Sequence, residues 1–98
     1  MTLGLEEEVM LLEPRTFGLL ECAPTLLERL PADGRFKLEL PACQLELLTA
    51  PRPDVAGAIA DLGAARRTLL EAADGLARPA AAGAVSYTHL TLPTIYSV

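Results

Sequence analysis

The sequence is poor in aromatic side chains and has no tryptophan, with two tyrosines and two phenylalanines among 98 residues. It has no cluster of Lys and Arg, and its net charge is −5, which argues against a nucleic-acid partner. No apolar run is long enough to cross a membrane, and the start "MTLGLEEE" lacks the basic and apolar regions of a signal peptide. We therefore expect a cytoplasmic protein without membrane or nucleic-acid partners.

Cysteine is also scarce. Cys22 and Cys43 are the only cysteines, and they lie far apart and outside any CxxC pattern. This spacing favours two reduced thiols packed as small apolar groups over a disulfide or a metal-binding pair. Because 51% of the residues are hydrophobic, the composition is that of a folded chain, and 98 residues allow at most one small domain with a modest core.

The first regular element is a strand over residues 3–12, predicted from the alternation of its side chains. One face is predicted to carry Leu3, Leu5, Glu7, Val9 and Leu11, and the other Glu6, Glu8 and Met10. Pro14 and Gly18 bracket a turn. The segment "APTLLERLP" then predicts a short helix, which tolerates Pro24 in its first turn and ends before Pro31.

Two further strands are expected on either side of Pro41, after a turn at Asp33-Gly34. In the first, Phe36, Leu38 and Leu40 are predicted to face one side, and Lys37 and Glu39 the other. In the second, Leu45 and Leu47 alternate with Gln44, Glu46 and Leu48. Pro41 leaves two alternatives open, a tight hairpin or one strand with an edge break.

The longest element is a helix that begins after Asp54, a good N-cap, and ends at Gly75 or Pro79. Its apolar residues recur at three- and four-residue steps: Val55, Ile59, Leu62, Leu69, Ala73 and Leu76. The order strand, short helix, strand, strand, long helix predicts an α+β unit with the long helix across one sheet face.

The glutamates of "GLEEEVMLL" stand out within this apolar strand. Glu6 and Glu8 lie on one face about 7 Å apart, where their repulsion is roughly 2 to 2.5 kcal/mol at an effective dielectric of about 20. Glu46 adds a third charge if its strand is a neighbour. A solvated face relieves the repulsion, and spacing alone favours it. A divalent cation is the alternative, since oxygen ligands suit Mg²⁺.

Glu7 fits neither alternative, because alternation places it among apolar side chains. An arginine partner would satisfy it, and Arg66 and Arg67 of the long helix are candidates. The pattern nevertheless favours these two arginines as part of a solvated helix face.

Three segments together resemble the N-terminal part of carboxylate–amine ligases of the glutamate–cysteine ligase type: "TLGLEEEVMLLEP", "GRFKLELPACQLELLTAPRPD" and "AARRTLLEAADGLARPAAAG". The resemblance implies a truncated part of a glutamine-synthetase-like antiparallel sheet with packing helices. It implies that Glu6, Glu8 and Glu46 bind magnesium and ATP. Glu39 matches an acidic position just upstream, and "TAPRP" departs from the Thr-Pro-Pro-Cys usual in the family.

The implied activity is ATP-dependent and ADP-forming. A glutamate-like carboxylate would be activated as an acyl phosphate and attacked by an amine such as cysteine, with residues outside the magnesium site left unknown. Residues 1–84 would be the N-terminal fragment of the catalytic domain, which we expect to be inactive by itself. Whether the intact protein forms a homo-oligomer stays open. The alternative is a non-catalytic small α+β module whose long helix is an interaction surface.

The composition changes after Arg78, the last charged residue. Residues 85–98 read either as an ordinary exposed strand or as a non-native tail. The triplets GTC TCT TAT ACA CAT CTG ACG CTG CCG ACG encode Val85 to Thr94 and resemble a transposase mosaic end with its sequencing adapter. We interpret the tail as translated adapter that is unstructured or packs adventitiously, and we assign His89 no role.

Overall fold

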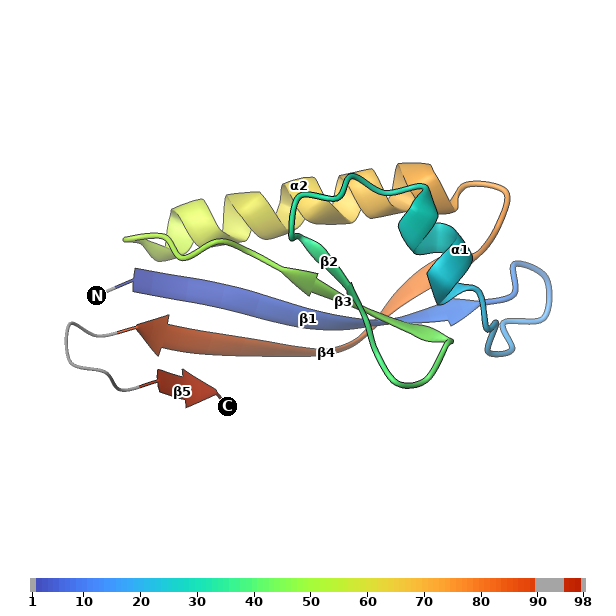
Figure 1. The fold of residues 1–98 in the computed structure, drawn as a ribbon, viewed down its shortest axis with the longest axis horizontal. Coiled ribbons are helices and arrows are strands. Elements are labelled where there is room, and N and C mark those ends of the chain that lie inside the picture. Colours follow the sequence, from blue (N-terminus) through green and yellow to red (C-terminus); the bar gives the residue numbers. More distant parts are fainter. Residues whose placement is uncertain (1, 90–94, 98) are drawn as a thin grey trace.

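The computed structural model describes residues 2–89 and 95–97 of the chain. Its elements are β1 (Thr2–Leu12), α1 (Ala23–Glu28), β2 (Phe36–Leu38), β3 (Gln44–Leu48), α2 (Val55–Ala73), β4 (Arg78–His89) and β5 (Ile95–Ser97). The described strands form one antiparallel sheet in the order β2-β3-β1-β4-β5, and α2 runs along the length of β1 (Figure 1). The α+β prediction is confirmed. Among the described residues, no helix combines the length and apolarity that a membrane crossing requires.

Strand β1 is the middle of the sheet and separates two chemically different faces. Val9 and Leu11 are buried together with Glu7, whereas Glu8 is exposed and Glu6 and Met10 are half-buried. This is the predicted alternation, because successive side chains of a strand point to opposite faces. The backbone N–H of Leu5 donates to Thr49 Oγ1 at 2.9 Å, which ties β1 to the end of β3.

The segment around Pro41 is a hairpin, in which β2 pairs with β3 and residues 39–43 connect them. Phe36 is buried, whereas Leu38 and Leu40, which the alternation predicts to face the same side as Phe36, are 42% and 101% exposed. The reason is that β2 is a three-residue edge strand. The chain leaves the sheet after Leu38, so the alternation that buries Phe36 does not continue.

Helix α2 begins where the sequence predicts, because the Asp54 side chain accepts a hydrogen bond from the Gly57 N–H at 2.6 Å. It ends at Ala73, and Gly75 follows in the left-handed region with φ 77°. The predicted buried face is partly wrong. Val55 and Ile59 are more than half exposed, and the small side chains of Ala58 and Ala65 are buried instead.

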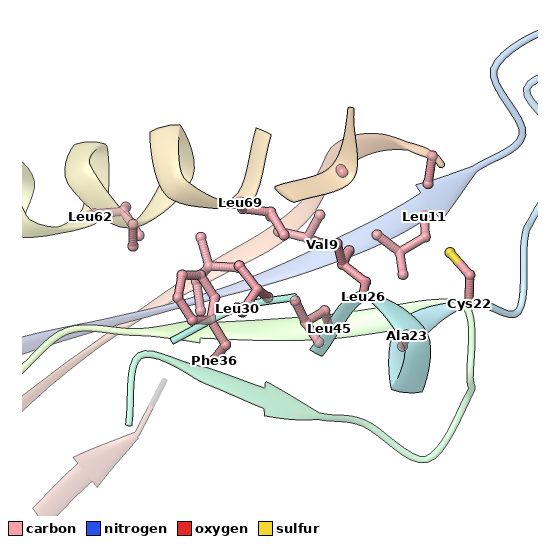
Figure 2. Close-up of a cluster of buried hydrophobic side chains, with 14 residues drawn as sticks. Val9, Leu11, Cys22, Ala23, Leu26, Leu30, Phe36, Leu45, Leu62 and Leu69 are labelled. Atoms are coloured by element: carbon pink, nitrogen blue, oxygen red, sulfur yellow. The ribbon is translucent and has the colours of Figure 1, made fainter. Parts of the chain in front are cut away.

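Both described helices pack on the same face of the sheet, where they close one core. Figure 2 shows this core, in which side chains of β1 and β3 meet those of α1 and α2. Its fully buried large side chains are Leu11, Leu26, Leu45, Leu47 and Leu69. Helix α1 forms as predicted with a proline in its first turn, and it contributes Ala23 and Leu26. The predicted short helix is therefore one wall of the core.

The two cysteines are unpaired, as the sequence predicts. Cys22 lies in the core, and burial raises the pKa of its thiol. Cys43 is half-buried in the hairpin connection. Neither belongs to a metal-binding cluster within the described residues.

The tail pairs with the sheet in its described part. Strand β4 continues from Arg78 through His89 along β1, and β5 pairs with β4. Of the two outcomes expected for the tail, the unstructured one does not hold for residues 85–89 and 95–97, which pair with the sheet, whereas residues 90–94 and 98 lie outside the described residues. Backbone N–H and C=O groups along the edge of β1 can pair with almost any extended segment, so this pairing is compatible with adventitious packing.

Candidate metal–nucleotide site

The strand register brings three of the predicted carboxylates onto one sheet face. Glu8 of β1 lies directly opposite Glu46 of β3, and Glu6 lies opposite Leu48. Directly opposite residues of an antiparallel pair point to the same face. Glu6, Glu8 and Glu46 therefore share the face opposite to α1 and α2. The condition that the sequence left open, namely that the strand of Glu46 is a neighbour of β1, is met.

Glu46 is the carboxyl group that this environment perturbs most clearly. Partial burial raises its pKa from 4.5 to about 7, and a side-chain hydrogen bond with Glu39 and the charges of Glu39 and Glu6 act in the same direction. Lys37 partly opposes them. Two carboxyl groups hydrogen-bond only when one of them carries a proton. The cluster thus holds more negative charge near pH 7 than its protein surroundings compensate.

The hairpin places Glu39 and Lys37 at the edge of this cluster. Lys37 lies opposite Glu46 in the register of β2 and β3, and Glu39 follows β2 in the connection. Glu39 is half-buried, whereas Lys37 is exposed. The structure therefore brings Glu39, Glu46 and Glu6 within electrostatic reach of one another, while Glu8 adjoins Glu46 through the backbone register and points into solvent.

The chemistry of these side chains fits a hard divalent cation, since carboxylate oxygens are the ligands that Mg²⁺ takes and a cation would lower the raised pKa of Glu46. Their arrangement is not a closed ligand set. Within the part of the chain that the structure describes, no group of three or more His, Cys, Asp or Glu side chains converges on one metal position. Binding would require the exposed Glu8 and half-buried Glu6 to change rotamer toward Glu46.

There is room for a ligand beside Glu8. Its partner on β4 is Gly83, and a Cβ atom built at Gly83 would have nothing within 4 Å. The pairing of β1 with β4 is irregular immediately afterwards, because Glu8 pairs with Gly83 and Val9 with Ala81. One extra residue, Ala82, therefore forms a bulge next to the carboxylates. Nothing in the sequence singles out Gly83, because only the strand register relates it to Glu8.

Glu7 points to the opposite face and has an arginine partner. Its side chain is 3% exposed, and the Arg66 Nε–H donates to Glu7 Oε1 at 2.9 Å while Arg66 Nη2 donates to Glu7 Oε2. The pairing also raises the pKa of Arg66. The arginine partner that the sequence leaves as the less favoured alternative is thus present, since a buried carboxylate requires a charged partner. Arg66 and Arg67 are nevertheless both exposed, as expected of a solvated helix face.

The sequence profile described as "Glutamate-cysteine ligase family 2(GCS2)" matches residues 2–91, which is most of the chain. The chain belongs to glutamate–cysteine ligase family 2. The match includes both carboxylate segments, with Glu6, Glu8, Glu39 and Glu46.

Individual relatives agree with this assignment. A protein of Rubrobacter xylanophilus named "Putative glutamate--cysteine ligase 2-2" is 44% identical over 77 residues, which are 79% of this chain and 20% of the relative. A protein of Dechloromonas aromatica named "Putative glutamate--cysteine ligase 2" is 41% identical over 71 residues, 69% of this chain and 18% of the relative. The chain thus spans about a fifth of the length of these relatives.

Proposed function

We propose that the chain is the N-terminal part of an ATP-dependent, ADP-forming carboxylate–amine ligase. Membership in the family supports the ligase class. The observation that carries the proposal is the shared face of Glu6, Glu8 and Glu46, with a Glu46 pKa of about 7. This is the arrangement expected where a cation and the phosphates of a nucleotide complete the charge balance.

In this proposal, Glu6, Glu8 and Glu46 hold Mg²⁺, and Glu39 assists through its contact with Glu46. The ion would supply positive charge to the transferring phosphoryl group. The chain's own residues position the ion, because β1 and β3 present the carboxylates from a rigid sheet and Gly83 leaves space beside Glu8. The substrates would be a glutamate-like carboxylate and an amine such as cysteine, as the relatives' names indicate.

The proposal places the protein in the cytoplasm, where ATP and reduced cysteine are available. It leaves open whether the intact protein forms a homo-oligomer. It also holds that the 98-residue chain alone is inactive. In this proposal, the chain supplies the metal-binding carboxylates on the open face of its sheet. The residues that bind both substrates would come from the remaining four-fifths of the protein.

The test is to express the full-length protein from its source locus and measure ADP release with glutamate and cysteine, alone and together. We expect ADP release that requires Mg²⁺ and both substrates, and hydroxylamine should trap the acyl phosphate as a hydroxamate. Glu46→Gln should remove the activity, and Glu28→Gln, on the exposed surface of α1, is the matched control. If no amine in a panel of amino acids supports ADP release, the ligase proposal is wrong.

The second candidate is a non-catalytic interaction module. Its support is the exposure of Val55, Ile59 and Leu70 along α2. An open reading frame that stops soon after the codon for Ala84 would favour this candidate, and a frame that continues for several hundred codons would favour the ligase.

A further inference from the structure

The Glu7–Arg66 ion pair lies directly behind the candidate metal site. Glu7 stands between Glu6 and Glu8 in the sequence, and its side chain points to the opposite face of the sheet, where it is buried. Arg66 comes from the middle of α2 and binds both carboxylate oxygens. The segment that carries the two candidate ligands is thus attached to the long helix at its central residue.

The Glu7–Arg66 pair constrains the position of β1 relative to α2 more tightly than an exposed surface ion pair would. Glu7 is 3% exposed, whereas the Arg66 side chain is 52% exposed, so the carboxylate is fixed in the protein and the guanidinium reaches it from the flank of α2. Two parallel hydrogen bonds between planar groups restrict rotation as well as distance. A hollow of about 180 Å³ adjoins the pair, and only the carboxylate end of the pair is withdrawn from water.

A second feature lies next to Glu8, at one end of the three glutamates. The bulge at Ala82 interrupts the regular pairing of β1 with β4 between Glu8 and Val9. Bulges bend a strand locally and re-aim neighbouring side chains. On the β4 side, Glu6, Glu7 and Glu8 pair in regular register up to Gly83, and the pairing becomes irregular immediately after Glu8. The orientation of β1 at the Glu8 end of this segment therefore depends more on β3 and on α2.

We propose that the Glu7–Arg66 ion pair fixes the backbone of Glu6 and Glu8 beside Glu46 by holding β1 against α2 from the other face of the sheet. Glu7 and Arg66 are positioning residues in this inference and touch neither metal nor nucleotide. The inference rests on the proposed function insofar as Glu6 and Glu8 are metal ligands. It assigns the buried middle glutamate a role that the ligand set alone does not.

The decisive variants are Glu7→Gln and Arg66→Met, alone and combined. Glutamine keeps the shape of Glu7 and removes its charge. The matched control is Leu69→Ala, which removes buried volume from the same helix–sheet contact one turn further along α2 and changes no charge. If the ion pair has only a structural role, Glu7→Gln, Arg66→Met and Leu69→Ala should each lower the melting temperature. At temperatures well below melting, none of them should then change the metal affinity.

The positioning role predicts a different result in the full-length protein. Glu7→Gln should raise the Mg²⁺ concentration for half-maximal activity by about 10- to 100-fold, the range found when supporting partners of metal ligands are removed. Leu69→Ala should change it little. The combined variant should be no worse than the more affected single variant, because both remove the same interaction. An unchanged Mg²⁺ requirement in Glu7→Gln, or additive effects, would overturn the proposal.

A readout without activity separates this inference from the proposed function. In the 98-residue chain, residual dipolar couplings report the orientation of the Cα–Hα bonds of Glu6 and Glu8 relative to α2, and titration with Mn²⁺ alone reports metal affinity. Glu7→Gln should reorient these two bonds and weaken Mn²⁺ binding, whereas Leu69→Ala should do neither. Reoriented bonds in the 98-residue chain, together with a full-length protein that lacks ligase activity, would support the positioning role and refute the ligase. If Glu7→Gln does not fold, the same couplings are measured in Arg66→Lys, which keeps the positive charge and loses the two-point contact. An unchanged orientation of the Glu6 and Glu8 bonds in this variant contradicts the proposal.

Discussion

Replacing Glu46 by glutamine should make the folded chain more stable at alkaline pH, even though it removes a candidate ligand. In the parent, Glu46 loses its proton next to Glu39 and Glu6 while partly withdrawn from water, which raises its pKa to about 7. Glutamine has nearly the same shape and stays neutral. The variant should therefore escape the electrostatic penalty that the parent acquires as Glu46 ionises.

The sign and size follow from the two pKa values. A carboxyl whose pKa is 4.5 when unfolded and about 7 when folded contributes stability that is fully present below pH 4.5 and is lost as the pH rises through 7. Each pKa unit corresponds to about 1.4 kcal/mol, which gives an upper bound of about 3.5 kcal/mol for this shift. Because Glu46 is half-exposed, solvent screening reduces the expected loss to roughly 1–2 kcal/mol.

The assay is urea unfolding of the 98-residue chain from pH 4 to pH 8.5. The free energies of unfolding of parent and Glu46→Gln should coincide near pH 4 and diverge by roughly 1–2 kcal/mol at pH 8, with the variant more stable. Glu28→Gln, which removes a carboxylate on α1, should run parallel to the parent. A constant difference between parent and Glu46→Gln over the whole pH range would refute the reasoning.

Magnesium provides an independent arm of the same experiment. If the cation binds the ionised cluster, Mg²⁺ at pH 8 should stabilise the parent by RT ln(1 + [L]/Kd) and should do little for Glu46→Gln. Equal stabilisation of both proteins by Mg²⁺ would mean that the ion acts elsewhere. The pH divergence would then describe repulsion on a solvated face, which is the alternative that spacing alone favours.

Three further predictions concern the fold and the tail. Asp54→Ala should lower the free energy of unfolding by about 1 kcal/mol, measured with urea, because the Gly57 N–H loses its acceptor. Gly75→Ala should lower it by roughly 1–2 kcal/mol, since φ is 77° there, and an unchanged midpoint would contradict the assigned helix end. Sequencing the source locus with a different library chemistry should give codons after Ala84 that differ from Val85–Thr94, and genomic codons for "SYTHLTLPT" would contradict the adapter interpretation.

The elements that local rules describe well were predictable from the sequence. Strand β1 follows from its alternation and the start of α2 from an Asp54 N-cap. Pro41 between two alternating runs leaves a hairpin and an edge break both open, and the structure has the hairpin. Each depends on contacts within a few residues. The family resemblance added the carboxylate set, which spacing alone favours as a solvated face.

The face of α2 shows where local rules stop. Periodicity selects Val55 and Ile59 because they are the larger apolar side chains, yet they are more than half exposed. The helix lies on the sheet through Ala58, Ala65 and Leu69, and small side chains allow its backbone to approach β1 closely. Which of two adjacent helix faces is buried depends on the surface opposite, and the helix sequence does not contain that surface.

Glu7 gives the same lesson for the site. Alternation correctly places Glu7 away from Glu6 and Glu8, but it does not say whether a buried carboxylate finds a cation. The answer depends on how α2 is placed along β1, because this placement puts Arg66 over Glu7. Three adjacent glutamates therefore differ in environment because the two faces differ. On the helix side Arg66 pairs with the middle carboxylate. On the open side the outer two lie beside Glu46, and among the described residues no ion pair includes them, which is the physical reason to look for a bound cation there.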